Sequence, residues 1–433
     1  MGGGWIIKHL WLLAPIKRVI FKILIFACIL ENLRSFIPEN IPFPAKLFLT
    51  GKIFQGIGNG IFNVILQLYL TSLGFSGSTL GYVFMMMALS SAILTLPIGI
   101  IADRVGKRKL LFVGLCSITI AVIIFLWTKN PLMIMFSFLC IGVSNSTFVV
   151  LNPLISLLFS EDDMDKAFSL WFSLGVVTQS LSSLLGFIPP LLVNVLGITF
   201  QRAYWFLIAF GSVFLVGQCV FFFLSAKGEV IKPSSKDNLF FLTSKGLVFK
   251  FSILSFLTSV AFGVFITLFP FYVNQKLGIQ SDALGMLMFL SSFASAAAQI
   301  VAPKLSGRLG SVKTIALVIG LAVPFYILIP FSSTFTAVSV WYIMMFSLVA
   351  MANPLIISIY MKNLVAEEKS TANGIRMTFM QGGNVIGPWL GGQLMERVSL
   401  GFPALLGGGI YAATAILTWL LLKDLDSRAN ILR

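Results

Sequence analysis

Long apolar segments, separated by short polar loops, constrain this chain more than any other feature of its sequence. From Thr50 onward, twelve segments are long enough to cross a bilayer, which takes about 20 apolar residues in a helix. They cover residues 50–72, 80–102, 109–128, 131–157, 167–195, 203–224, 249–273, 282–302, 313–331, 336–359, 371–394 and 401–422. We therefore predict an all-α membrane protein with twelve transmembrane helices, since helices satisfy their own backbone groups in lipid.

Composition agrees with a membrane protein and argues against other classes. Of the 433 residues, 58% are hydrophobic and 10% are charged, and the mean hydropathy is +0.98, which is too apolar for a soluble globular chain. The net charge of +15 could indicate nucleic-acid binding, but the basic residues are spread over short loops and form no continuous patch. We expect a small-molecule substrate and the lipid bilayer as partners, and no nucleic acid.

Enzymatic chemistry has little support in the sequence. The only histidine, His9, lies near the amino terminus, and the four cysteines are scattered singly through apolar segments. The acidic cluster that begins at Glu161 has no aligned metal ligands, and no Gly-rich phosphate loop is present. We therefore expect no metal, no cofactor and no catalytic residues.

The chain also contains an internal repeat. At an offset of 204 residues, equal residues coincide without a gap: Leu73-Gly74 with Leu277-Gly278, Leu80-Gly81 with Leu284-Gly285, Arg104 with Arg308, Gly106 with Gly310, and Lys109 with Lys313. Two pseudo-symmetric six-helix bundles are expected, at residues 48–224 and 248–424. They are joined by a polar cytoplasmic linker at 225–247 and followed by a cytoplasmic tail at 425–433.

Residues 1–47 are predicted to form an amphipathic extension at the membrane interface. Trp5 and Trp11 would place their rings at the lipid headgroups, and the neighbouring lysines would face anionic lipid. A short additional membrane-embedded helix is the alternative.

Basic residues predict the orientation of the helices. If the amino terminus is cytoplasmic, the outer loops carry only Lys129, Arg202, Lys276 and Arg397 of the 30 Lys and Arg residues. Lys and Arg favour cytoplasmic loops. Both termini are therefore expected in the cytoplasm of a multi-pass protein of the cell membrane.

A basic loop lies between the second and third segments, with the sequence Gly99-Ile-Ile-Ala-Asp103-Arg104-Val-Gly106-Lys107-Arg108. This pattern resembles the cytoplasmic signature loop of the major facilitator superfamily (MFS). The resemblance implies a secondary transporter that works by alternating access, in which this loop helps to close the cytoplasmic side. We expect both glycines at places where the chain turns tightly. A topology signal alone is the simpler alternative for the basic residues.

The first helix has the clearest polar pattern. Gln55, Asn59, Asn63 and Gln67 recur every four residues and drift by only about 40° per step, so they share one helix face. Such a face must point inward in lipid. Gln55, Asn59 and Asn63 are predicted to line the substrate cavity, and interhelical hydrogen bonding is the alternative.

Further cavity candidates are spread over the later helices: Asn145, Asn152, Gln179, Asn353, Arg376, Gln381 and Asn384. Asn152-Pro153 and Asn353-Pro354 are also expected to mark kinks. Lys52 and Arg376 are cations at membrane depth, which either snorkel to the interface or contact an anionic substrate.

Glycines crowd the eleventh segment, at Gly383, Gly387, Gly391 and Gly392. Gly387-Pro388 resembles the glycine-proline signature that drug exporters of the family carry on their fifth helix. Because it stands here on the eleventh, close helix packing is the expected role.

Phe and Met residues are abundant, whereas charged groups are scarce, so efflux of amphipathic or hydrophobic compounds by a monomer is the favoured function. The alternative is a facilitated carrier for a sugar or small organic anion, and a receptor or lipid scramblase on the same fold comes third. No acidic residue lies in the middle of a predicted span, so transport is expected to follow the substrate gradient unless Asp103 or Asp282 couples a proton.

Overall fold

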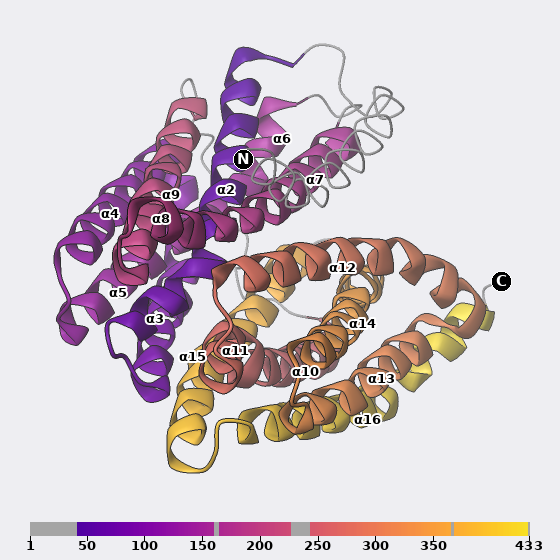
Figure 1. Cartoon of the computed structure of the whole chain (residues 1–433). Helices are drawn as coiled ribbons and strands as arrows, with labels where there is room; N and C mark the ends of the chain where they lie inside the picture. The colour runs from indigo at the N-terminus through magenta and orange to yellow at the C-terminus, as the bar shows by residue number, and fades with distance from the viewer. Residues whose placement is uncertain (1–40, 160–163, 227–242, 365–367, 432–433) are drawn as a thin grey trace, which may run out of the picture.

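The computed structural model describes residues 41–159, 164–226, 243–364 and 368–431, and nearly all of them are helical (Figure 1). The first half contains α2 (Phe43–Ser72), α3 (Gly77–Val105), α4 (Lys107–Trp127), α5 (Pro131–Thr147), α6 (Leu151–Leu158), α7 (Met164–Ser183), α8 (Ile188–Leu196) and α9 (Phe200–Ser225). The second half contains α10 (Lys245–Phe265), α11 (Phe269–Leu277), α12 (Ser281–Leu309), α13 (Ser311–Phe331), α14 (Phe335–Lys362), α15 (Lys369–Arg397) and α16 (Phe402–Ile431). The predicted all-α class is confirmed.

Eleven helices of the described residues are long and apolar enough to cross a membrane. The remaining long helix is α15, which has 29 residues but contains many glycines and polar side chains. It packs against α3 on one side and α10 on the other, so protein covers much of its surface in place of lipid. A protein-covered helix does not need a uniformly apolar surface. The twelve-helix architecture is confirmed, with α15 as its most polar member.

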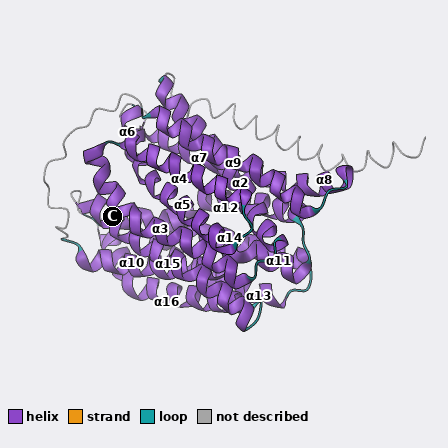
Figure 2. Ribbon diagram, turned by 90° about the vertical axis from the view of Figure 1, so that its left-hand side faces the viewer, coloured by secondary structure: helices purple, strands orange, loops and turns teal. Residues whose placement is uncertain are grey.

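Two pairs of glycines have a positive φ at positions that are related by the predicted offset. Gly74 (φ 86°) corresponds to Gly278 (φ 65°), and Gly106 (φ 95°) corresponds to Gly310 (φ 90°). Positive φ strains residues that carry a Cβ, so glycine suits all four turns. We call the end of the molecule with Gly74 and Gly278 the Gly74 end, and the end with Gly106 and Gly310 the Gly106 end. Figure 2 shows α8 and α11 at the first end and α6 and α10 at the opposite end.

Several boundaries differ from those predicted. Helix α2 begins at Phe43, so the expected boundary at residue 47 falls inside a helix. The predicted extension lies mostly in residues 1–40, which are outside the described part of the chain, as are residues 227–242 of the linker. Helix α16 continues to Ile431, through most of the expected tail.

Only one of the two tight turns expected in the basic loop is present. Gly99 lies inside α3, in regular helix, whereas Gly106 separates α3 from α4. The prediction for Gly99 was wrong because one left-handed glycine is sufficient to reverse the chain here.

The two Asn-Pro pairs behave differently. Before Pro153, the chain passes from α5 through a short 3-10 turn (Phe148–Val150) into α6, as expected where proline removes a helix hydrogen bond. Helix α14 contains Pro354 and continues past it without interruption.

The two halves meet closely at the Gly74 end. Helix α3 packs on α15, and α12 packs on α7 and a 3-10 turn (Leu184–Phe187). A Cβ at Gly81 would lie 2.6 Å from the carbonyl oxygen of Pro388. Toward the Gly106 end the halves diverge (Figure 1), and Phe172 of α7 and Ile300 of α12 are 59% and 73% exposed.

Candidate functional site

A cavity of about 500 Å³ lies in the second half, between α10, α13, α14, α15 and α16. Its walls are mostly apolar and aromatic, with Phe251, Phe262, Phe346, Met377 and Met380 among them. Small-molecule sites in proteins commonly have this size and this apolar character. The cavity is therefore large enough for a drug-sized molecule.

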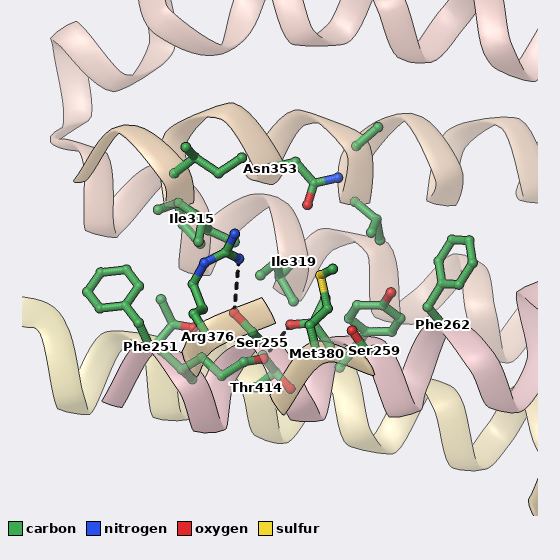
Figure 3. Close-up of a pocket in the computed structure, with 18 of the residues that line it drawn as sticks. Phe251, Ser255, Ser259, Phe262, Ile315, Ile319, Asn353, Arg376, Met380 and Thr414 are labelled. Atoms are coloured by element: carbon green, nitrogen blue, oxygen red, sulfur yellow. Dashed lines mark hydrogen bonds between the residues drawn. The ribbon is translucent and has the colours of Figure 1, made fainter. Parts of the chain in front are cut away.

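Arg376 is the charged residue in the described lining of this larger cavity, and polar side chains such as Asn353 and Thr414 lie along the same lining (Figure 3). The Arg376 guanidinium donates to the Ser255 hydroxyl over 3.3 Å and to the Asn373 side-chain oxygen over 3.2 Å. The side chain is 8% exposed and lies 5.8 Å from the Tyr360 ring centroid. Asn353 and Asn384 also line the cavity, so three of the predicted residues are brought together here.

A smaller cavity of about 110 Å³ lies between α2 and α7 in the first half. Here the Lys52 ammonium donates to the Gln55 side-chain oxygen over 2.8 Å and lies 4.5 Å from the Trp171 ring centroid. Asn59 and Gln179 complete the polar lining. Three of the predicted residues therefore line this smaller cavity together with Lys52, the second cation at membrane depth.

The other predicted residues line neither of these two cavities. Asn63 and Asn145 are exposed, and Gln381 accepts a hydrogen bond from Asn384 over 2.8 Å. Asn152 lies in α6, and its side chain is outside the described part of the structure.

Gln67 has a different role from the amides before it. It is 5% exposed, its amide donates to the Thr267 carbonyl over 2.5 Å, and its oxygen accepts from the Phe271 backbone N–H over 3.0 Å. These backbone groups lie where a 3-10 turn (Ile266–Leu268) separates α10 from α11. Phe271 is also the residue that the 204-residue repeat aligns with Gln67. For Gln67, the interhelical alternative is confirmed, and the contact joins the two halves at the Gly74 end.

Two further hydrogen bonds join the halves at the Gly74 end. The Tyr204 hydroxyl and the Gln280 side-chain oxygen are 2.7 Å apart, and the Ser78 backbone N–H donates to Glu396 over 3.2 Å. The Gly74 end is therefore closed in this conformation by backbone packing and by hydrogen bonds.

The basic loop is described only in part. The side chains of Asp103 and Arg104 lie outside the described structure. Lys107 and Arg108 begin α4, and the Arg108 guanidinium lies 4.7 Å from the Phe223 ring centroid of α9. The gating role of this loop stays a prediction.

The glycines of α15 allow close helix packing, as expected. A Cβ at Gly383 would lie 2.6 Å from the Phe256 carbonyl oxygen, and one at Gly387 would lie 2.7 Å from Gly263 Cα. The backbones of α10 and α15 are therefore nearly in contact, which draws Arg376 and Ser255 together across this interface.

Sequence reasoning missed most of the hydroxyl groups of the larger cavity. Ser255 and Ser259 come from α10, and Thr414 and Thr418 come from α16. Spacings of three or four residues on otherwise apolar helices are the signal that could have identified them.

The fold and the two cavities define a membrane transporter built from two related helix bundles. The family profile described as Major Facilitator Superfamily matches residues 48–364 and 251–431, and the chain belongs to this family.

Curated relatives and solved structures extend this comparison. The chain is 22% identical to Multidrug resistance protein 2 of Bacillus subtilis (strain 168), over 84% of this chain and 91% of the relative. It is 25% identical to Quinolone resistance protein NorA of Staphylococcus aureus (strain MSSA476), over 84% of this chain and 92% of the relative. A crystal structure of the nucleoside transporter NupG aligns with a TM-score of 0.69 at 15% identity, covering 88% of this chain and all of NupG. That structure supports the fold alone.

The amides in the first half permit a direct test of substrate contact. Asn59→Leu and Asn63→Leu are expected to weaken substrate binding more than they lower the melting temperature, because both amides are exposed and their removal leaves no buried partner without a hydrogen bond. Binding affinity and melting temperature of the same purified samples would check this. Unchanged affinity with a lower melting temperature would indicate that these amides stabilise the fold and do not bind substrate.

Proposed function

We propose that this transporter exports amphipathic or hydrophobic small molecules by alternating access. The observation that carries this proposal is the lining of the larger cavity, in which aromatic and Met side chains surround a few polar groups. Flexible thioethers and aromatic rings adapt to ligands of different shape. The names of the two curated relatives, which refer to multidrug and quinolone resistance, favour the same activity.

In this proposal the Gly106 end faces the cytoplasm of a cell, and both termini lie on that side. The distribution of Lys and Arg over the loops supports this orientation. The described conformation is then open toward the cytoplasm, and a monomer contains the whole transport path. Substrate would enter from the cytoplasm or the inner lipid leaflet and leave when the Gly74 end opens.

A facilitated carrier for a sugar or small organic anion is the second candidate. The group of Lys52, Gln55, Asn59 and Gln179 favours it, because amides and an ammonium suit the hydroxyl and carboxylate groups of such substrates. A neutral sugar that competes with amphipathic dyes for transport would support this second candidate.

Purified protein in liposomes would test export. Vesicles are given a cationic, a neutral and an anionic amphipathic dye of similar size, and uptake is followed against concentration. Saturable uptake of at least one dye, above that of protein-free vesicles, is expected. Uptake that stays linear for every dye would contradict the proposal, and lipid-probe scrambling in the same vesicles would indicate a scramblase.

The basic loop is proposed to hold the Gly106 end shut in the opposite conformation. Asp103 lies one turn before Gly106, at the end of α3, and the amino terminus of α15 is at the same end of the molecule. A helix amino terminus favours an anion. Asp103→Asn is expected to slow transport strongly at nearly unchanged melting temperature, measured by dye flux and thermal unfolding. Normal flux in this variant would indicate that the charges of the loop only orient the helices in the membrane.

A further inference from the structure

We propose that the larger cavity binds amphipathic anions, and that Arg376 holds their carboxylate, sulfonate or phosphate group. This inference rests on the proposed transport of amphipathic molecules and narrows the substrate class. It follows from the charge of the cavity, the long hydrogen bonds of Arg376 to uncharged partners and the apolar walls around it.

Charge is the first argument. Arg376 is 8% exposed, about two turns into α15, and its charge is held away from bulk water. No Asp or Glu is among the described residues that line the cavity, and the described hydrogen-bond partners of the guanidinium are all uncharged. Tyr360 and Tyr411 are the titratable neighbours from α14 and α16. A buried cation without an anionic partner is costly, so an arriving anion gains the missing charge interaction.

Hydrogen bonding is the second argument. The guanidinium has five N–H donors in a planar fork. Its described acceptors are neutral, namely the Ser255 hydroxyl, the Asn373 amide oxygen and the Met377 sulfur, at 3.2 Å or more. Charge-assisted bonds to an oxyanion are shorter and stronger than these contacts. A two-oxygen anion could replace them without breaking an ion pair.

The Arg376 side chain is buried in protein and does not extend into solvent. Figure 3 shows the guanidinium directed into the space lined by Ser255, Ile315 and Asn353. Two of its hydrogen bonds go to Asn373, one turn nearer the Gly106 end, and one goes to Ser255 of α10. The guanidinium therefore stays within the cavity lining, where a ligand can reach it.

The surroundings of Arg376 define the rest of the ligand. Phe262, Ile319 and Met380 form apolar walls beyond the polar group, and the volume of about 500 Å³ accommodates one or two fused rings with a short substituent. The side chains of Asn353 and Asn384 can form hydrogen bonds with a second polar atom of the ligand. The inferred ligand therefore has an apolar body and one negative group.

The smaller cavity, in the first half, also contains a positively charged side chain. Lys52 lines the smaller cavity with neutral neighbours, and no Asp or Glu is among the described residues of its lining. Lys52 and Arg376 therefore both face cavities whose described lining contains no acid. An anionic substrate is the partner that this arrangement favours over a cationic one.

Three probes that share one ring system test this inference: 2-naphthalenesulfonate, the neutral 2-naphthalenesulfonamide and the cation trimethyl(2-naphthyl)ammonium. Dissociation constants are measured on full-length protein in nanodiscs of zwitterionic lipid, by quenching of tryptophan fluorescence. The sulfonate is expected to bind at least tenfold more tightly than the sulfonamide, and the cation is expected to bind most weakly. Equal affinities for sulfonate and sulfonamide would overturn the proposal, whatever the variants do.

Variants then test whether Arg376 causes the preference for the sulfonate over the sulfonamide. Arg376→Gln is expected to remove the difference between sulfonate and sulfonamide, whereas Arg376→Lys keeps the charge and part of the preference. Lys304→Gln is the matched control, because Lys304 is an exposed cation of the same half outside the cavity. A preference that survives Arg376→Gln, or disappears in Lys304→Gln, would overturn the assignment to Arg376.

Lipid phosphate could supply the same anionic chemistry. Repeating the titrations in nanodiscs with phosphatidylglycerol separates the two sources. Weaker sulfonate binding there in the wild type, but not in Arg376→Gln, would identify a lipid headgroup as a second ligand of the same site. The result is also independent of export, because saturable flux of neutral or cationic dyes without a sulfonate preference would leave the proposed function intact and refute this inference.

Discussion

Gln67→Leu is expected to open the Gly74 end of the molecule. The substitution removes two hydrogen bonds between the halves and leaves the Thr267 carbonyl and the Phe271 N–H without their partner in the closed conformation. In the open conformation water can satisfy both groups. Each bond contributes about 1 kcal/mol, so the equilibrium should shift by about 2 kcal/mol, or about thirtyfold, toward the open state.

Spin labels at the Gly74 end would measure this shift. Lys129 and Ser333 are exposed and belong to different halves, so Lys129→Cys and Ser333→Cys report their separation on a background without the four native cysteines. Gln67→Leu should move the distance distribution to longer values. Asn63→Leu, one turn earlier on α2, is the control, and it should leave the distribution unchanged. A Gln67→Leu distribution identical to that of the parent would show that the amide does not hold the halves together.

Gly391→Val is expected to prevent folding of the second half. A Cβ at this position would lie 2.8 Å from the carbonyl carbon of Val264, so the backbones of α10 and α15 would have to separate. Overpacking against rigid backbone should cost about 3 kcal/mol or more, a large fraction of typical stability. The yield of monodisperse protein in size-exclusion chromatography and its melting temperature would measure this loss.

Gly409→Val is the matched control for this prediction. Gly409 is an exposed helical glycine of α16, and a Cβ at this position would meet no other atom within 4 Å. This variant should fold like the wild type. Similar yields and melting temperatures for both valine variants would contradict the close contact between α10 and α15.

The fold was largely predictable because lipid leaves few alternatives for an apolar chain. Segment lengths predicted the helices, and the 204-residue repeat predicted the paired turns at Gly74, Gly278, Gly106 and Gly310. The ends of α2 and α16 were missed, since polar helical turns beyond the bilayer look like loops in a hydropathy pattern. Element ends also depend on local packing that no periodic pattern records.

The candidate site was predictable only in part. Four amides on one face of α2 look alike in sequence, yet Gln55 and Asn59 line a cavity while Gln67 binds the opposite half. What separates them is the neighbouring backbone: the interruption between α10 and α11 places backbone groups beside Gln67 that its amide can satisfy. Similarly, Ser255 gains its role from Arg376, which is more than a hundred residues away in the chain.

Counterflow in proteoliposomes would test the central claim, that this chain carries amphipathic molecules by alternating access. Vesicles are loaded with a high concentration of unlabelled 2-naphthalenesulfonate, or of whichever dye shows saturable uptake, and diluted into a trace of the labelled compound. A carrier that exposes one site to each side in turn should accumulate label transiently above the external concentration. Protein-free vesicles should show no such peak. Label that only equilibrates, at a rate linear in concentration, would contradict a carrier mechanism.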